Sequence, residues 1–120
     1  MTVSTRKLAD RLIGEEMAAY YKARASGDVA VAWVALERAH IVSQPFLGQH
    51  LANHRAMLSF EVEMRDWREA LGQLVRLALA PLGALTGRIP IGNAGRSNVS
   101  AFTPMPIAAD LRAKIDGLVE

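Results

Sequence analysis

Apolar residues recur every three or four positions along most of this chain, which is the spacing of one face of an α-helix. The pattern predicts a first helix over about residues 5–26 and a second over about residues 29–43. Gly27 suits the left-handed position that follows a helix, and Asp28 suits the N-cap of the next helix. The two stretches therefore predict a helical hairpin.

The same spacing continues through the middle of the chain. Pro45 is expected to end the second helix, because proline disfavours helical dihedrals in the residue before it. A third helix is expected from Pro45 or Phe46 to about Met64, because proline is tolerated in the first turn of a helix. Asp66 suits the N-cap of a fourth helix over about residues 67–80, which Pro81 is expected to end. The expected core face of this fourth helix consists of Leu71, Leu74, Val75, Ala78 and Leu79.

The character of the chain changes after Gly83. The next stretch, to about residue 100, is rich in glycine, serine and asparagine and predicts an irregular loop. A short last helix is expected over about residues 108–118. These patterns predict an all-α fold of about five helices in tetratricopeptide-like hairpins, forming a single domain over residues 1–120, with the glycine-rich loop before the C-terminal helix.

A faint internal repeat relates two of the predicted helices. Four positions correspond to four others thirty-eight residues later: Asp28, Ala32, Leu36 and Arg38 to Asp66, Ala70, Leu74 and Arg76. At the same offset, Glu37 corresponds to Val75 and His40 corresponds to Ala78. A helix with the same pattern thus lacks these two polar residues, which indicates that the fold alone does not require them.

All three histidines of the chain lie close to two glutamates in the second and third predicted helices. In an antiparallel hairpin, the pair Glu37 and His40 faces the pair His50 and His54, with Glu61 two turns beyond. Histidines four residues apart on a helix reach one ion. Imidazole and carboxylate ligands suit zinc, iron, manganese, nickel or copper. The sequence therefore predicts a divalent transition-metal site at these five residues.

Several observations limit this interpretation. Gln44, Asn53 and Gln73 are candidates for orienting imidazoles through hydrogen bonds. Leu51 follows His50 where a zinc protease would need glutamate, which argues against a metalloprotease. The alternative without metal is a buried hydrogen-bonded pair of Glu37 and His54 that fixes the register of the hairpin.

The glycine-rich stretch carries a second, weaker signal. Arg88 and Arg96 bracket its glycines, and two arginines beside free backbone amides can bind a phosphate or carboxylate. No predicted strand precedes the stretch, so neither a P-loop nor a dinucleotide-binding motif fits. The alternative is a structural cap in which these arginines pair with acidic side chains of the bundle.

Composition and charge restrict the classes of partner. The formal net charge is +2 and the basic residues are scattered among acidic ones, which disfavours nucleic-acid binding. The absence of cysteine excludes disulfides and thiolate ligands and fits a cytoplasmic protein. Neither a signal peptide nor a membrane span is expected. A metal ion is the expected ligand; a homodimer with the histidine face at its interface, or a protein partner, remains open.

Several short motifs together resemble a small bacterial family, domain of unknown function 3703. They are L-E-R-A-H-I-V-S-Q, H-x-x-x-H-x-x-M-L, G-Q-x-x-R and G-R-x-P-x-G-N-x-G-R, within about residues 27–111. The matching residues are Leu36, Glu37, Arg38, His40, Gln44, His50, His54, Met57, Gly72, Gln73, Arg76, Pro90, Gly92, Asn93, Gly95 and Arg96. The resemblance implies a small soluble protein and, through metal-resistance gene neighbourhoods of some members, a link to metals.

Two functional hypotheses follow. The first is a transition-metal-binding protein for binding, buffering or sensing, because no nucleophile–base pair or cofactor motif indicates a reaction. The second is a tetratricopeptide-like interaction module with a structural Glu/His network and no metal. Whether the protein is an enzyme is left open by the sequence.

Overall fold

The computed structural model describes residues 3–86 and 106–116 and contains only helices within these ranges. The helices are α1 (Val3–Ser26), α2 (Val29–Ser43), α3 (Leu47–Glu63), α4 (Trp67–Thr86) and α5 (Ala109–Asp116). The predicted all-α class with five helices is confirmed. Arg88 and Arg96 lie outside the described residues, so anion binding at these arginines stays a prediction.

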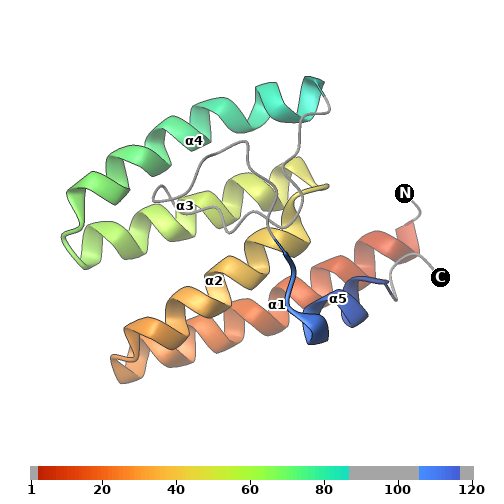
Figure 1. Cartoon of the computed structure of the whole chain (residues 1–120), viewed down its shortest axis with the longest axis horizontal. Helices are drawn as coiled ribbons and strands as arrows, with labels where there is room; N and C mark the ends of the chain where they lie inside the picture. Colours follow the sequence, from red (N-terminus) through yellow and green to blue (C-terminus); the bar gives the residue numbers. More distant parts are fainter. Residues whose placement is uncertain (1–2, 87–105, 117–120) are drawn as a thin grey trace.

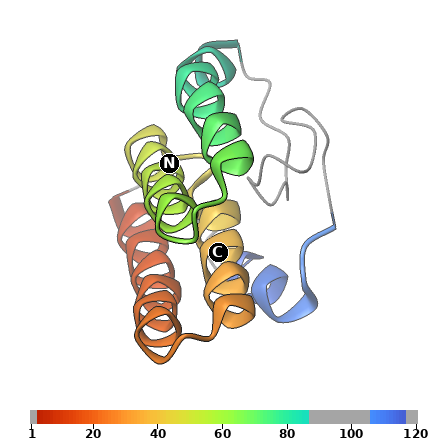
Figure 2. The same cartoon turned by 90° about the vertical axis from the view of Figure 1, so that its left-hand side faces the viewer.

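The helices form two stacked hairpins. α1 pairs with α2, α3 pairs with α4, and the two hairpins pack through α2 and α3 (Figure 1). Viewed from the side, the α3–α4 hairpin lies above the α1–α2 hairpin, and α5 lies beside α2 (Figure 2). The contact between α2 and α3 is therefore where one hairpin meets the other.

The turn between α1 and α2 has the geometry that its sequence predicts. Gly27 has a φ of 76°, in the left-handed region that a residue without a Cβ adopts at little cost. The backbone N–H of Asp28 donates to the carbonyl of Ala23 at 2.9 Å. The Asp28 carboxylate accepts from the N–H of Val31 at 3.1 Å and caps α2.

The turn between α3 and α4 repeats these bonds thirty-eight residues later. Arg65 occupies the glycine position with a φ of 57°. The N–H of Asp66 donates to the carbonyl of Glu61 at 2.9 Å, and its carboxylate accepts from the N–H of Glu69 at 3.2 Å. The faint sequence repeat is thus a real repeat of turn geometry.

An aromatic core joins the first hairpin to α3. The ring of Phe60 packs against Tyr20 of α1 and Trp33 of α2, with centroid separations of 5.6 and 5.3 Å. Leu36 and Met57 are fully buried in the same cluster. Burial of these large side chains is the main source of stability at this contact.

A second cluster holds α5 against the first hairpin. Leu111 is buried among Ala9, Val42 and Phe46, which come from α1, α2 and the turn after α2. The Arg38 guanidinium of α2 donates to both oxygens of Asp110 in α5, at 2.8 and 3.1 Å.

Arg38 also joins a third helix. Its Nε donates to Glu16 of α1 at 2.9 Å, so one guanidinium connects α1, α2 and α5. Planar guanidinium groups bind carboxylates through two parallel bonds, which fixes orientation as well as distance. The C-terminal helix is therefore held by both an apolar contact and a directed ion pair.

Two expectations about α4 are wrong. The helix continues through Pro81 to Thr86, because proline has a helical φ and costs the helix one backbone hydrogen bond without always ending it. The residues from Gly83 to Thr86 are therefore helix and not loop.

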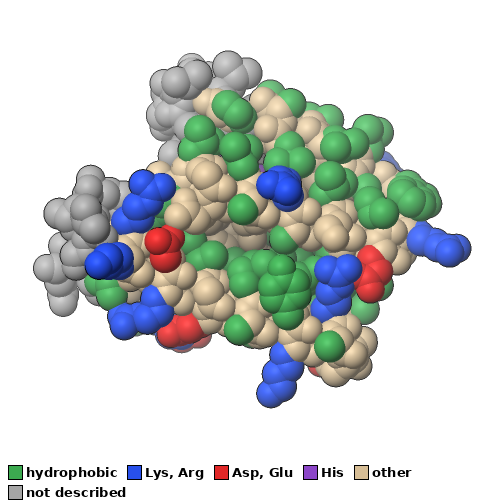
Figure 3. All heavy atoms as spheres, turned by 180° about the vertical axis from the view of Figure 1, so that it is seen from behind, with side chains coloured by type: hydrophobic (Ala, Val, Ile, Leu, Met, Phe, Trp, Pro, Cys, Tyr) green, Lys and Arg blue, Asp and Glu red, His purple; other side chains and the backbone are tan. Residues whose placement is uncertain are grey.

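The second correction concerns the expected core face of α4. Leu71 is 64% exposed and Leu74 is 52% exposed, and Val75 is exposed as well. Hydrophobic side chains accordingly reach the surface over the half of the molecule that holds α3 and α4 (Figure 3). None of the helices in the described ranges is long and apolar enough to span a bilayer.

Candidate metal centre

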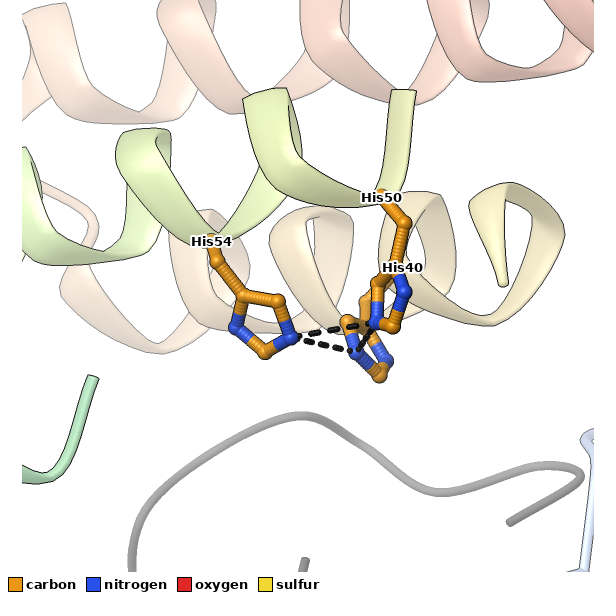
Figure 4. Close-up of side chains that lie close together, drawn as sticks. All are labelled: His40, His50 and His54. Carbon is orange, nitrogen blue, oxygen red and sulfur yellow. Dashed lines mark hydrogen bonds between the residues drawn. The ribbon is translucent and has the colours of Figure 1, made fainter. Parts of the chain in front are cut away.

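The three histidines meet at the contact between the two hairpins. His40 lies near the C-terminal end of α2, while His50 and His54 lie one turn apart on α3. The imidazoles of His50 and His54 project from α3 on the side away from α1, and the His40 ring meets them (Figure 4). Because α2 and α3 are joined by a short turn and run in opposite directions, one histidine on α2 reaches a pair on α3, as the sequence predicts.

Their Nε2 atoms form a compact triangle. The separations are 3.0 Å between His40 and His50, 3.1 Å between His50 and His54, and 3.2 Å between His40 and His54. A metal ion can be held where several histidine or acidic ligand atoms lie close together. Among the described residues, His40, His50 and His54 form such a group. His40 and His54 are buried, whereas His50 is half-buried.

Hydrogen bonding among neutral imidazoles does not account for this triangle. Each Nε2 of a neutral ring is either a donor or an acceptor, never both. Three such atoms in mutual contact therefore contain at least one pair of like atoms, either two lone pairs or two N–H groups. A cation at the centre removes the conflict, because all three nitrogens can then present lone pairs to it.

Gln73 of α4 sets the tautomer of one histidine. Its Oε1 lies 2.7 Å from Nδ1 of His54, so Nδ1 carries the proton and Nε2 presents a lone pair to the triangle. The Gln73 amide nitrogen lies 3.5 Å from the sulfur of Met57, a weak acceptor, which agrees with this orientation. The predicted hydrogen bond between Gln73 and an imidazole is thus present.

The surroundings of His50 and His54 favour the neutral form of these two imidazoles. Burial, followed by the electrostatic influence of His54, lowers the pKa of the His50 imidazole to about 4. Burial also lowers the pKa of His54, while its hydrogen bond to Gln73 opposes that change and the charge of Arg76 adds to it. Neutral imidazole is the form that binds metal ions, so at neutral pH no proton competes at these two rings.

Arg76 is a neighbour that sequence reasoning did not place at the site. This arginine is buried on α4, where burial lowers its pKa and the charges of Glu69 and Glu61 oppose that change. It acts electrostatically on His54. The sequence did indicate its position. In the G-Q-x-x-R motif, Arg76 follows Gln73 by three residues, and residues three apart share a helix face.

The other candidate ligands are not part of the triangle. Glu37 is half-buried one turn before His40, and Glu61 is fully buried, but neither carboxylate belongs to the converging group. Ligation by these two glutamates stays a prediction. Asn53 donates to the carbonyl of Leu36 at 3.0 Å, so its amide nitrogen ties α3 to α2 and does not orient an imidazole.

The predicted contact of Gln44 with an imidazole stays open. Gln44 is buried at the C-terminal end of α2.

Comparison with known proteins identifies a family for this chain. No curated protein and no solved structure matches it. Residues 7–115 match the family described as "Protein of unknown function (DUF3703)". The matched range contains the helices that carry the site, α2, α3 and α4. The chain therefore belongs to the DUF3703 family, as its sequence motifs indicate.

Proposed function

We propose that this protein binds one divalent transition-metal ion through the Nε2 atoms of His40, His50 and His54. The observation that carries the proposal is the triangle of nitrogens with sides of 3.0 to 3.2 Å. Three imidazole ligands on one ion in a tetrahedral site lie roughly 3.3 Å apart when each metal–nitrogen bond is about 2.0–2.1 Å. The geometry of the side chains is therefore close to what an ion requires, with little movement needed.

The donor set narrows the class of ion. Imidazole nitrogen suits zinc, copper, iron and nickel, whereas magnesium and calcium prefer oxygen ligands. Storage, buffering or sensing of such an ion fits the site better than catalysis, because no nucleophile or acid–base pair among the described residues accompanies the triangle.

Elemental analysis after loading with zinc, cobalt or nickel tests the proposal. The chain has only three histidines, so protein without a histidine tag reports on this site alone. We expect one ion per chain in the parent protein and none in His54→Ala or His40→Ala. Arg55→Ala is the matched control, because Arg55 adjoins His54 in sequence but is exposed.

A metal-free parent protein would contradict the proposal. If His54→Ala then also lost stability, the histidines would form a structural network.

The second candidate is a tetratricopeptide-like interaction module, and the uncovered apolar face of α4 favours it. Exposed leucine and valine side chains on one helix are a common feature of surfaces that bind another helix. Chelation separates the two functions. An interaction module keeps its partner affinity after treatment with a chelator, whereas a metal protein loses its ligand.

A further inference from the structure

The size of the nitrogen triangle limits where an ion can sit. The centre of a triangle with sides of about 3.1 Å lies roughly 1.8 Å from each corner, which is shorter than a zinc–imidazole bond of about 2.0–2.1 Å. An ion bound to all three nitrogens therefore sits about 1 Å outside their plane. The three histidines then cap one side of the ion and leave the opposite side without a histidine.

This arrangement fits a planar three-coordinate ion less well and favours an ion that has further ligands. An ion outside the plane, with nitrogen–metal–nitrogen angles of roughly 100°, has the geometry of a tetrahedral or octahedral centre. With three positions taken by histidines, a tetrahedral centre has one coordination position left for another ligand, and an octahedral centre has three. Sites with three protein ligands and an open position bind water or an exogenous ligand there.

Charge favours an anion at the open position. Three neutral imidazoles leave the charge of a divalent ion uncompensated, unlike a donor set that contains carboxylates. Arg76 adds positive charge beside His54, and Glu69 and Glu61 act on Arg76. Glu37, one turn before His40, does not belong to the converging group of ligand atoms.

His50 is the most exposed of the three histidines. His50 is half-buried, whereas His40 and His54 are each 3% exposed. Among the described residues, the His50 side is thus the more exposed side of the triangle, and the aromatic core around Phe60 lies farther along α3.

We propose that the ion held by His40, His50 and His54 keeps an exchangeable position and binds a small monodentate anion there. This inference rests on the proposed metal site and names its second ligand. It makes the centre a reversible receptor for small anions and not a closed structural site.

Cobalt(II) and azide provide the test. Cobalt(II) replaces zinc in nitrogen sites, and its visible absorption bands change when a ligand binds. The parent protein is loaded with one cobalt per chain, which is checked by elemental analysis after gel filtration, in buffer with perchlorate as the only other anion. Azide is then titrated, and imidazole is titrated in a parallel sample as a neutral monodentate ligand.

We expect a saturable shift of the cobalt bands with one azide per cobalt, and a much weaker response to imidazole. A shift with imidazole alone would overturn the choice of an anion. Unchanged bands with azide in the parent, but shifted bands in Glu37→Gln, would show that Glu37 fills the position and would overturn the proposal. Unchanged bands in both proteins would overturn it too.

Failure of the metal site itself would look different. Cobalt would then be absent from the protein after gel filtration, before any azide is added, and the inference would be overturned together with the proposed function. Bound cobalt with bands that ignore azide leaves the metal site standing and removes only the anion.

Discussion

α2 and α4 occupy equivalent positions in the two hairpins, but their apolar faces have different surroundings. Trp33 and Leu36 of α2 are 9% and 0% exposed, because α3 covers them. The equivalent residues of α4, Leu71 and Leu74, are largely exposed. The same pattern thus produces a core face inside the stack and a surface at its end, where no further hairpin packs among the described residues.

The two helices also share the site in different ways. α2 supplies His40 as a member of the triangle, while α4 supplies Gln73 and Arg76 around His54. At the equivalent positions, α2 has Ala35 where α4 has Gln73, and α4 has Ala78 where α2 has His40. His40 and Gln73 are thus additions to a common helical pattern, whereas Arg76 corresponds to Arg38 and belongs to that pattern.

The largest expected difference between the two helices is in stability. Leu36→Ala empties a fully buried position, so we expect a loss of about 2–5 kcal/mol in the free energy of unfolding. Leu74→Ala, at the equivalent exposed position, should cost less than about 1 kcal/mol. Urea unfolding of both variants measures the difference. Equal losses would show that another part of the molecule covers α4 in solution.

Acid should act on the α2–α3 contact. The pKa of His50 is about 4 in the folded protein and about 6.5 in the unfolded chain, so the unfolded state binds more protons between these values. We therefore expect the metal-free protein to lose stability as the pH falls from about 6.5 to about 4, by on the order of 3 kcal/mol. Unfolding curves at several pH values test this, and His50→Ala should flatten the profile. An unchanged profile in that variant would assign the effect to other groups.

The contribution of α4 to the metal site can be isolated at Gln73. Gln73→Met keeps the volume of the buried side chain but removes the oxygen that accepts from Nδ1 of His54. Loss of such an outer partner typically lowers metal affinity about 10–100-fold, and we expect an effect of that size by competition titration. An unchanged affinity would mean that His54 keeps its tautomer without α4.

The smallest expected effect concerns the two equivalent turns. Arg65 has the left-handed φ that Gly27 has in the first turn, and a side chain makes this conformation costly by roughly 1 kcal/mol. Arg65→Gly should therefore stabilise the protein by up to about 1 kcal/mol, and Gly27→Ala should destabilise it by a similar amount. Thermal unfolding measures both, and destabilisation by Arg65→Gly would indicate that the arginine side chain contributes contacts.

Local signals in the sequence were sufficient for the helices and for the histidines. The ends of α2 follow from the Asp28 cap and from Pro45, which are chemical properties of single residues. The four-residue spacing of His50 and His54, together with the short turn before α3, brings His40 to them. Both inferences depend on contacts that are close along the chain.

Features that depend on the whole stack were not predictable. Apolar spacing identified the wrong face of α4, because its buried residues are Ala70, Gln73 and Arg76, whereas Leu71, Leu74 and Val75 are exposed. The prediction at Pro81 failed because tertiary packing can hold a helix through a proline. Spacing also placed Glu37 beside His40, but whether its carboxylate reaches the triangle depends on helix rotation, which spacing does not encode.

The position of the histidines between two hairpins has a consequence for the lifetime of the folded state. An ion bound to α2 and α3 at once is a reversible cross-link between units that are otherwise held at this contact by packing and by hydrogen bonds such as that from Asn53 to the carbonyl of Leu36. Separation of the hairpins then requires the breaking of coordinate bonds, so occupancy should slow unfolding. If the hairpins dock late in folding, the refolding rate should change little. The exchange rate of backbone amide hydrogens at the end of α2 and the start of α3 should then fall when the ion is bound, so this rate measures ion occupancy.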